Sequence, residues 1–128
     1  MKTCRVEVLA CVTGHGVTPT LCERMTGLVG TYAWSRDAYP DRSSWGLSRE
    51  AEVVDVGDAV SPLLAVISSA EGRWLVMLAE NPSWRSSLIV TITVELDPTS
   101  EDYPRIAFEV QQVHQIARLK LAIDVTFR

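Results

Sequence analysis

The stretch that decides the fold is residues 88–96, Leu88-Ile89-Val90-Thr91-Ile92-Thr93-Val94-Glu95-Leu96. Every second residue from Leu88 onward is a large aliphatic one, whereas the positions between them turn polar toward the end of the stretch. Successive side chains of a β-strand point to opposite faces, so this alternation predicts a strand with one buried face and one mostly wet face. Such strands favour a sheet whose apolar face is covered by helices.

The same period of two recurs near the amino terminus, in Val6, Val8, Ala10 and Val12. Arg5 and Glu7 interrupt the apolar run before Leu-Ala-Cys, so the segment lacks the continuous core of a lipoprotein signal. We therefore expect a strand, a retained amino terminus and a cytoplasmic protein. Further strands are expected over 45–54 and 106–110, the latter antiparallel to its predecessor, with Asp97-Pro98-Thr99-Ser100 as the turn between them. A closing strand is expected to bury Ile123, Val125 and Phe127.

Helix signals lie between these strands. Thr18-Pro19 predicts the start of a short helix, with Thr20 and Glu23 as an alternative start, and Gly27 predicts its end. Ser61-Pro62 predicts the start of the main helix, which Gly72 can divide and Asn81-Pro82 ends. Residues 30–44 have the composition of an aromatic-rich loop. The apolar helical positions are Leu63, Leu64, Ile67, Trp74, Leu75 and Leu78 in the main helix, and Val113, Ile116 and Ala117 in a short third helix.

The expected element order is strand, helix, strand, helix, strand, strand, helix, strand. This order predicts an α/β (α+β) two-layer sandwich, in which a largely antiparallel sheet carries helices on one face. The length of 128 residues is that of one ordinary domain, and neither a linker nor a repeat divides it, so residues 1–128 are expected to form a single domain.

Composition narrows the classes of function. Sixteen Asp and Glu against twelve Lys and Arg give a net charge of −4, which disfavours nucleic acid and favours a basic partner. No stretch of about 18 apolar residues occurs, so no membrane span is expected. Cys4, Cys11 and Cys22 form no CxxC pair and indicate reduced thiols in the cytosol.

Catalytic and metal-binding motifs are missing from the sequence. His15 and His114 stand alone, with no HExxH spacing, and Cys11 and Cys22 with His15 match no recognised ligand pattern. The glycines form no phosphate-binding loop, and no GxSxG elbow occurs. We therefore expect no enzyme, no metal and no cofactor, and an enzyme that uses His15 or Cys22 is the weakest alternative.

Two groups of residues are candidates for binding a partner. Glu50, Glu52, Asp55 and Asp58 cluster on the second long strand and its exit, either as a solvated edge or as an acidic docking face. Trp34, Arg36 and Asp37 lie in the aromatic loop, where Trp34 either folds back as a lid or serves as an anchor. The other tryptophans are expected to be structural: Trp74 in the core, Trp45 inward, and Trp84 at the edge of the sheet.

The layout resembles a family of small bacterial proteins, domain of unknown function 4279. The likeness lies in the Thr18-Pro19 helix entry, Gly27-Leu28, the loop with Trp34, Trp45-Gly46-Leu47, the Leu-rich helix and the close from Ile106-Ala107-Phe108 through Ile116-Ala117 to Ala122-Ile123-Asp124-Val125. The family carries a glycine before its last strand, where this chain has Lys120-Leu121. The resemblance implies an acidic protein encoded beside secreted toxins, that is, a candidate immunity protein whose partner is a cognate toxin. The alternative is a small-molecule-binding or regulatory domain, with the aromatic loop over a pocket.

Overall fold

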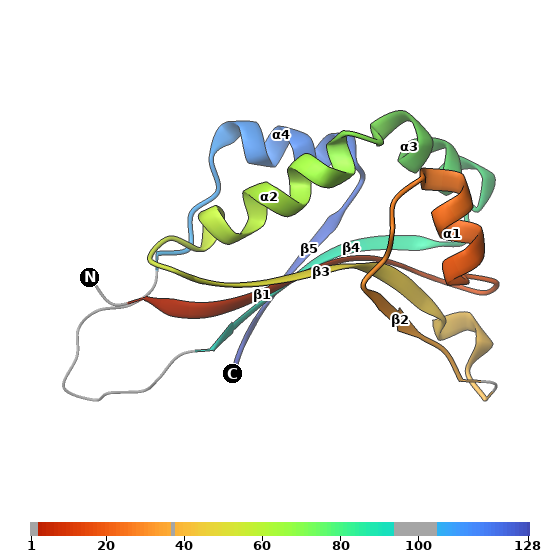
Figure 1. The fold of residues 1–128 in the computed structure, drawn as a ribbon, viewed down its shortest axis with the longest axis horizontal. Helices are drawn as coiled ribbons and strands as arrows, with labels where there is room; N and C mark the ends of the chain where they lie inside the picture. Colours follow the sequence, from red (N-terminus) through yellow and green to blue (C-terminus); the bar gives the residue numbers. More distant parts are fainter. Residues whose placement is uncertain (1–2, 37, 94–104) are drawn as a thin grey trace.

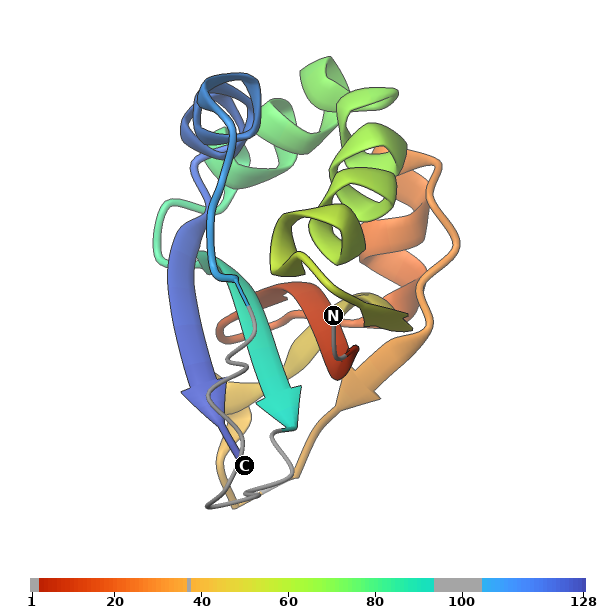
Figure 2. The ribbon, with the colours of Figure 1, turned by 90° about the vertical axis from the view of Figure 1, so that its left-hand side faces the viewer.

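The structure is a computed structural model that describes residues 3–36, 38–93 and 105–128. Five strands form one sheet in the order β2-β3-β1-β4-β5, and the helices α1 to α4 lie on one side of it (Figures 1 and 2). This arrangement confirms the predicted α+β two-layer sandwich with a mostly antiparallel sheet.

The sheet is built around β1 (Cys4–Thr13), which pairs antiparallel with both β3 (Ser44–Val53) and β4 (Arg85–Thr93). The predicted alternation is confirmed in both β1 and β4. The side chains beneath the helices have no exposed surface: Val6, Val8, Ala10, Val12, Leu88, Val90 and Ile92. The predicted strand residues Val94 and Leu96, and the turn over 97–100, lie outside the described residues.

Helix α1 (Pro19–Thr26) begins and ends at the residues that the sequence predicts. The Thr18 hydroxyl accepts a hydrogen bond from the Leu21 N–H at 3.2 Å, and Pro19 opens the first turn. Gly27 adopts φ +73° and donates its N–H to the Glu23 carbonyl at 2.8 Å. The cap is therefore Thr18, and the alternative start at Thr20 is wrong.

The main helix begins six residues earlier than Ser61-Pro62 predicts, so that prediction is wrong. Helix α2 (Val56–Ser68) is capped by Asp55, whose carboxylate accepts a hydrogen bond from the Gly57 N–H at 3.1 Å. The extra turn buries Val56 and Val60 against the core, which offsets the hydrogen bond that Pro62 lacks inside the helix.

A bend of 77° separates α2 from α3 (Glu71–Glu80). The break lies at Ser69 and Ala70, and Gly72 lies within the first turn of α3. Asn81-Pro82 follows the last turn of α3, as predicted. In the described part of the chain, no one helix combines the length and apolar character needed to cross a bilayer; α2 and α3 taken together do so by length and composition alone.

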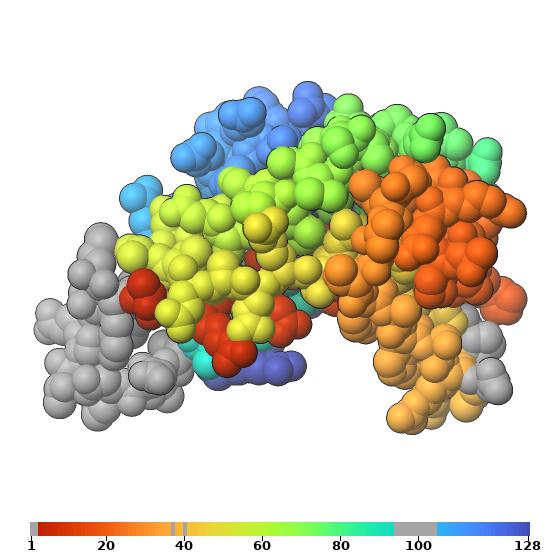
Figure 3. Space-filling view, viewed as in Figure 1, coloured from red at the N-terminus to blue at the C-terminus, as the bar shows by residue number. Residues whose placement is uncertain are grey.

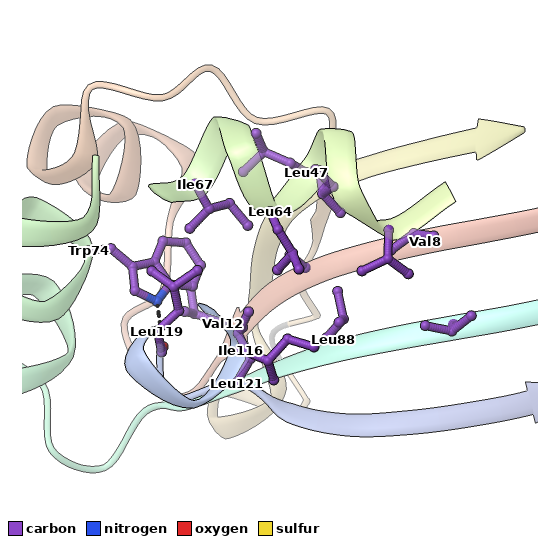
Figure 4. Close-up of a cluster of buried hydrophobic side chains, with 14 of the residues drawn as sticks. Val8, Val12, Leu47, Leu64, Ile67, Trp74, Leu88, Ile116, Leu119 and Leu121 are labelled. Carbon is purple, nitrogen blue, oxygen red and sulfur yellow. Dashed lines mark hydrogen bonds between the residues drawn. The ribbon is translucent and has the colours of Figure 1, made fainter. Parts of the chain in front are cut away.

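The core lies between this helical layer and the sheet (Figure 4). Leu64 and Ile67 of α2 are fully buried, and so is Trp74 of α3. The Trp74 indole N–H donates to the Leu119 carbonyl at 3.0 Å, which ties α3 to the end of α4. The prediction for Trp45 is confirmed as well, because Trp45 is fully buried. Trp84 is 8% exposed and directly precedes β4, which is an interior strand and not an edge strand.

Residues 30–44, predicted to be a loop, contain a short strand. β2 (Tyr32–Trp34) pairs antiparallel with β3, and the 3-10 turn η1 (Pro40–Arg42) leads back into β3. A strand of three residues is too short to show a period of two, which is why the sequence pattern misses it.

The strand predicted over 106–110 is wrong. In the described residues around it, only Arg105 makes a bridge, to Asp55, and Val110 begins helix α4 (Val110–Arg118). The helical pattern predicts that Val113, Ile116 and Ala117 face inward. Ile116 is buried as predicted, but Val113 and Ala117 are exposed. Buried Gln112 takes the inward position: its amide donates to the Gly57 carbonyl at 2.8 Å and its oxygen accepts from the Glu109 N–H at 2.9 Å.

Helix α4 ends with a non-glycine residue in the left-handed region. Lys120 has φ +57°. Its N–H donates to the Ala117 carbonyl at 3.1 Å, and the Leu121 N–H donates to the Ile116 carbonyl at 3.1 Å. These two bonds form a Schellman motif, completed by the buried pair Ile116 and Leu121. Glycine is the usual residue at the position of Lys120.

The last strand, β5 (Ala122–Phe127), pairs parallel with β4 at the edge of the sheet. The prediction that it buries Ile123, Val125 and Phe127 is wrong for two of the three. Ile123 is 46% exposed and Phe127 57% exposed, and only Val125 packs partly against the core. An edge strand has a single neighbour, and the helical layer does not bury these two positions.

Candidate functional site

Strand register gathers three carboxylates on the sheet face that points away from the helices, here called the open face. Glu7 of β1 lies directly opposite Glu50 of β3, and Glu52 is opposite Arg5. All four side chains are exposed. We call Glu7, Glu50 and Glu52 the acidic patch.

Arg5 is the cation within the acidic patch. Its guanidinium forms an ion pair with Glu50, diagonally across the strand pair. The hydrogen bond to Glu50, followed by the charge of that carboxylate, raises the pKa of Arg5. One guanidinium thus accompanies three carboxylates, and the patch keeps a negative charge.

Two of the predicted acidic residues lie elsewhere. Asp55 is the N-cap of α2 and forms an ion pair with Arg105 at 3.8 Å, so its carboxylate has a structural role. Asp58 is exposed on the first turn of α2, where a negative charge favours the helix dipole. The predicted cluster therefore divides between the sheet and the helix start, and only Glu50 and Glu52 share the open face.

The aromatic residues occupy the opposite end of the open face. Tyr32 is opposite Gly46, and Trp34 is opposite Ser44. Ser44 precedes Glu50 by six residues on the same strand, about 20 Å at 3.3 Å per residue. Trp34 is 37% exposed and belongs to a segment that protrudes from the body (Figure 3). Arg36 is exposed in the following loop, and Asp37 lies outside the described residues.

A depression of about 400 Å³ lies beside Trp34. His15, Thr18 and Pro19 form one wall, and Ala33, Trp34 and Ser44 form the other. Trp34 therefore borders a surface hollow between the start of α1 and strand β2. It does not cover the core as a lid, because it is not among the side chains that pack against the core.

The three cysteines are free and buried. Burial raises the pKa of each thiol, that of Cys22 to about 11, so all three are protonated at neutral pH. The thiolate is the reactive form, and a buried thiol of high pKa is a poor nucleophile. Across residues 3–36, 38–93 and 105–128, no group of three His, Cys, Asp or Glu side chains is placed to hold a metal ion.

Sequence reasoning missed two residues of this face, Glu7 and Tyr32. The alternation in β1 assigns Glu7 to the wet face, but only the pairing with β3 places it against Glu50. Tyr32 was missed because its strand, β2, lies within residues predicted to be a loop.

Comparison with known proteins finds no match among family models, curated proteins or solved structures. The resemblance to domain of unknown function 4279 therefore stays a prediction.

Proposed function

We propose that this chain is a binding protein whose acidic patch docks a basic surface of a protein partner. The observation that carries the proposal is the register of β1 and β3, which sets the exposed Glu7 and Glu50 opposite one another with Glu52 beside them. Clustered charge of one sign steers a partner of opposite charge and speeds its association.

The electrostatics of the patch favour an external partner. Like charges directly opposite each other on neighbouring strands destabilise a sheet. Arg5 offsets part of this repulsion through its ion pair with Glu50. Lysine or arginine side chains of a bound protein would neutralise the remainder.

We infer further that the partner is a cognate toxin and that the chain is its immunity protein. The resemblance to domain of unknown function 4279 supports this assignment. Its acidic character adds support, because toxin domains with basic surfaces are natural targets for steered binding. A cytoplasmic location belongs to the same proposal, since the inhibitor has to meet the toxin where the toxin acts.

The depression beside Trp34 favours a second candidate, the binding of a small molecule. Ligand pockets are concave and combine aromatic surface with a few polar groups, and Trp34, His15 and Thr18 supply both kinds here. In a thermal-shift screen of small metabolites, a true ligand should raise the melting temperature of the parent but not that of Trp34→Ala.

Co-expression with the toxin encoded beside this gene tests the main proposal. We expect rescue of growth and a purified complex. Glu7→Lys and Glu52→Lys should each slow association and flatten its dependence on salt, with melting temperatures close to the parent. Glu80→Lys is the matched control, because Glu80 is exposed at the end of α3, outside the patch.

Each outcome of this experiment is decisive. Absence of both rescue and complex would remove the toxin assignment. A complex whose association rate is equal for Glu52→Lys and Glu80→Lys would place the interface away from the acidic patch. Asp55 is unsuitable for charge reversal, because the cap of α2 would be lost with the charge.

A further inference from the structure

Among the described residues, β5 is an edge strand with little protection against pairing. It is the terminal strand of the sheet beside β4, with six residues that include no lysine or proline and one charged side chain, Asp124. Natural proteins commonly blunt an edge with such residues or keep it very short, as β2 is here with three residues. β5 therefore offers a template for another strand.

The backbone groups that point outward can be assigned from the ladder. The Arg128 N–H donates to the Ile92 carbonyl at 2.9 Å, within the parallel register of β4 and β5. Residues of a strand alternate in the direction of their N–H and C=O groups, so Ala122, Asp124 and Thr126 also bond toward β4. Ile123, Val125 and Phe127 then direct their backbone groups away from the sheet.

The same three residues carry the exposed apolar surface of β5. Ile123 and Phe127 are each about half exposed, and helix α4 contributes exposed Val110 and Val113 on the same side of the sheet (Figure 2). The outer edge thus combines apolar side chains with backbone groups that have no partner strand among the described residues.

We propose that β5 pairs antiparallel with β5 of a second copy of this chain, about a two-fold axis at Val125. In this register Val125 faces Val125, and Ile123 faces Phe127 of the other copy, with all of these residues bonding outward. Asp124 faces Thr126 on the other face of the strand, and its diagonal neighbours are Arg128 and Asp124 of the other copy. Apolar side chains therefore meet apolar ones, and the opposite charge of Arg128 offsets the repulsion between the two Asp124 side chains.

Neighbouring registers fit less well. Moving the axis to Asp124 sets Asp124 opposite Asp124 of the other copy. This like-charge pair would be a non-hydrogen-bonded pair, in which the two side chains are closest. Moving the axis to Thr126 leaves Ile123 with no β5 residue opposite it. The register centred on Val125 matches the outward-bonding residues of both copies, gives each of residues 123–127 a partner, and keeps Asp124 from facing its own copy directly.

This inference is independent of the proposed function. The acidic patch lies on β1 and β3, separated from β5 by β4. Pairing through β5 would leave the patch of each copy free for a partner.

Sedimentation equilibrium and light scattering test the proposal on the full chain. At tens of micromolar we expect a particle of twice 14.2 kDa. Val125→Pro should give a folded monomer, because proline is tolerated on an edge strand where the N–H points outward. Phe127→Lys should also give a monomer, and Val76→Lys, at an exposed apolar position of α3, is its matched control and should stay dimeric.

A charge exchange tests the register. Asp124→Arg and Arg128→Asp should each weaken dimerisation about tenfold, and the double exchange should restore it. A monomeric parent, or a dimer that survives in folded Val125→Pro, would overturn the proposal. A double exchange that dimerises no better than either single variant would overturn the register, because Asp124 would then not lie beside Arg128 of the other copy.

Discussion

Replacing Lys120 by glycine should stabilise the protein. Lys120 has φ +57° at the end of α4, and this conformation costs a non-glycine residue about 1–2 kcal/mol. Glycine removes this cost, but it also has more conformational freedom in the unfolded chain, which lowers the stability of the folded state by about 0.4–1 kcal/mol. We expect a net gain of about 1 kcal/mol, which is a rise of about 3–5 °C in melting temperature for a chain of this size.

Urea unfolding followed by tryptophan fluorescence is a suitable assay, with the melting temperature as a second measure. Lys120→Ala is the first control, because it removes the side chain but keeps the strain, and it should change stability by less than about 0.5 kcal/mol. Ala117→Gly is the second control, at an exposed position inside α4, and should cost about 1 kcal/mol. If Lys120→Gly is no more stable than Lys120→Ala, the strain argument is refuted.

Three other perturbations probe the core, the edge and the thiols. Phe127→Ala should cost only about 1 kcal/mol by denaturant unfolding, because more than half of the side chain is exposed; a cost of about 3–5 kcal/mol would show a buried site. Gln112→Leu should cost about 2 kcal/mol or more, since the Glu109 N–H loses its partner and both the Gly57 carbonyl and the Ser61 hydroxyl lose the Gln112 amide. Its exposed neighbour gives the control, because Gln111→Leu should stay within about 0.5 kcal/mol. Burial raises the pKa of Cys22 from 9.0 to about 11, so its contribution to stability is complete below pH 9.0 and is lost as the pH rises through about 11. Cys22→Ala should therefore lose less stability than the parent over that range, and equal losses would contradict the assignment.

Local signals predicted α1 and β1 correctly but failed at the start of α2. The caps of α1 and the alternation in β1 depend on neighbouring positions alone, and both are confirmed. The predicted start of α2 is wrong because Ser61-Pro62 has the sequence typical of a helix N-terminus but lies inside the helix. The earlier start of α2 is favoured by tertiary packing, because it buries Val56 and Val60 in the core.

The remaining errors concern the edge of the sheet. Residues 106–110 have a strand-like pattern, but β5 takes the free edge of β4, and no second strand can pair there. The alternation in β5 predicts a strand correctly, yet burial depends on which layer covers it. The candidate site also depends on tertiary structure. Glu50 and Glu52 could be predicted because acidic residues cluster there in the sequence, whereas Glu7 joins them only through the pairing of β1 with β3.

The position of β1 at the centre of the sheet also affects how the chain folds during synthesis. Val8 pairs with Arg49 and Val90, residues made 41 and 82 positions later. At a translation rate of 5–20 residues per second, the second partner emerges about 4–16 s after Val8. Throughout that interval an aliphatic strand on the nascent chain lacks one of its two neighbours, and contacts so distant in sequence slow folding. β1 thus leaves the ribosome before either of its neighbours and is completed late, which exposes it to chaperones and to aggregation.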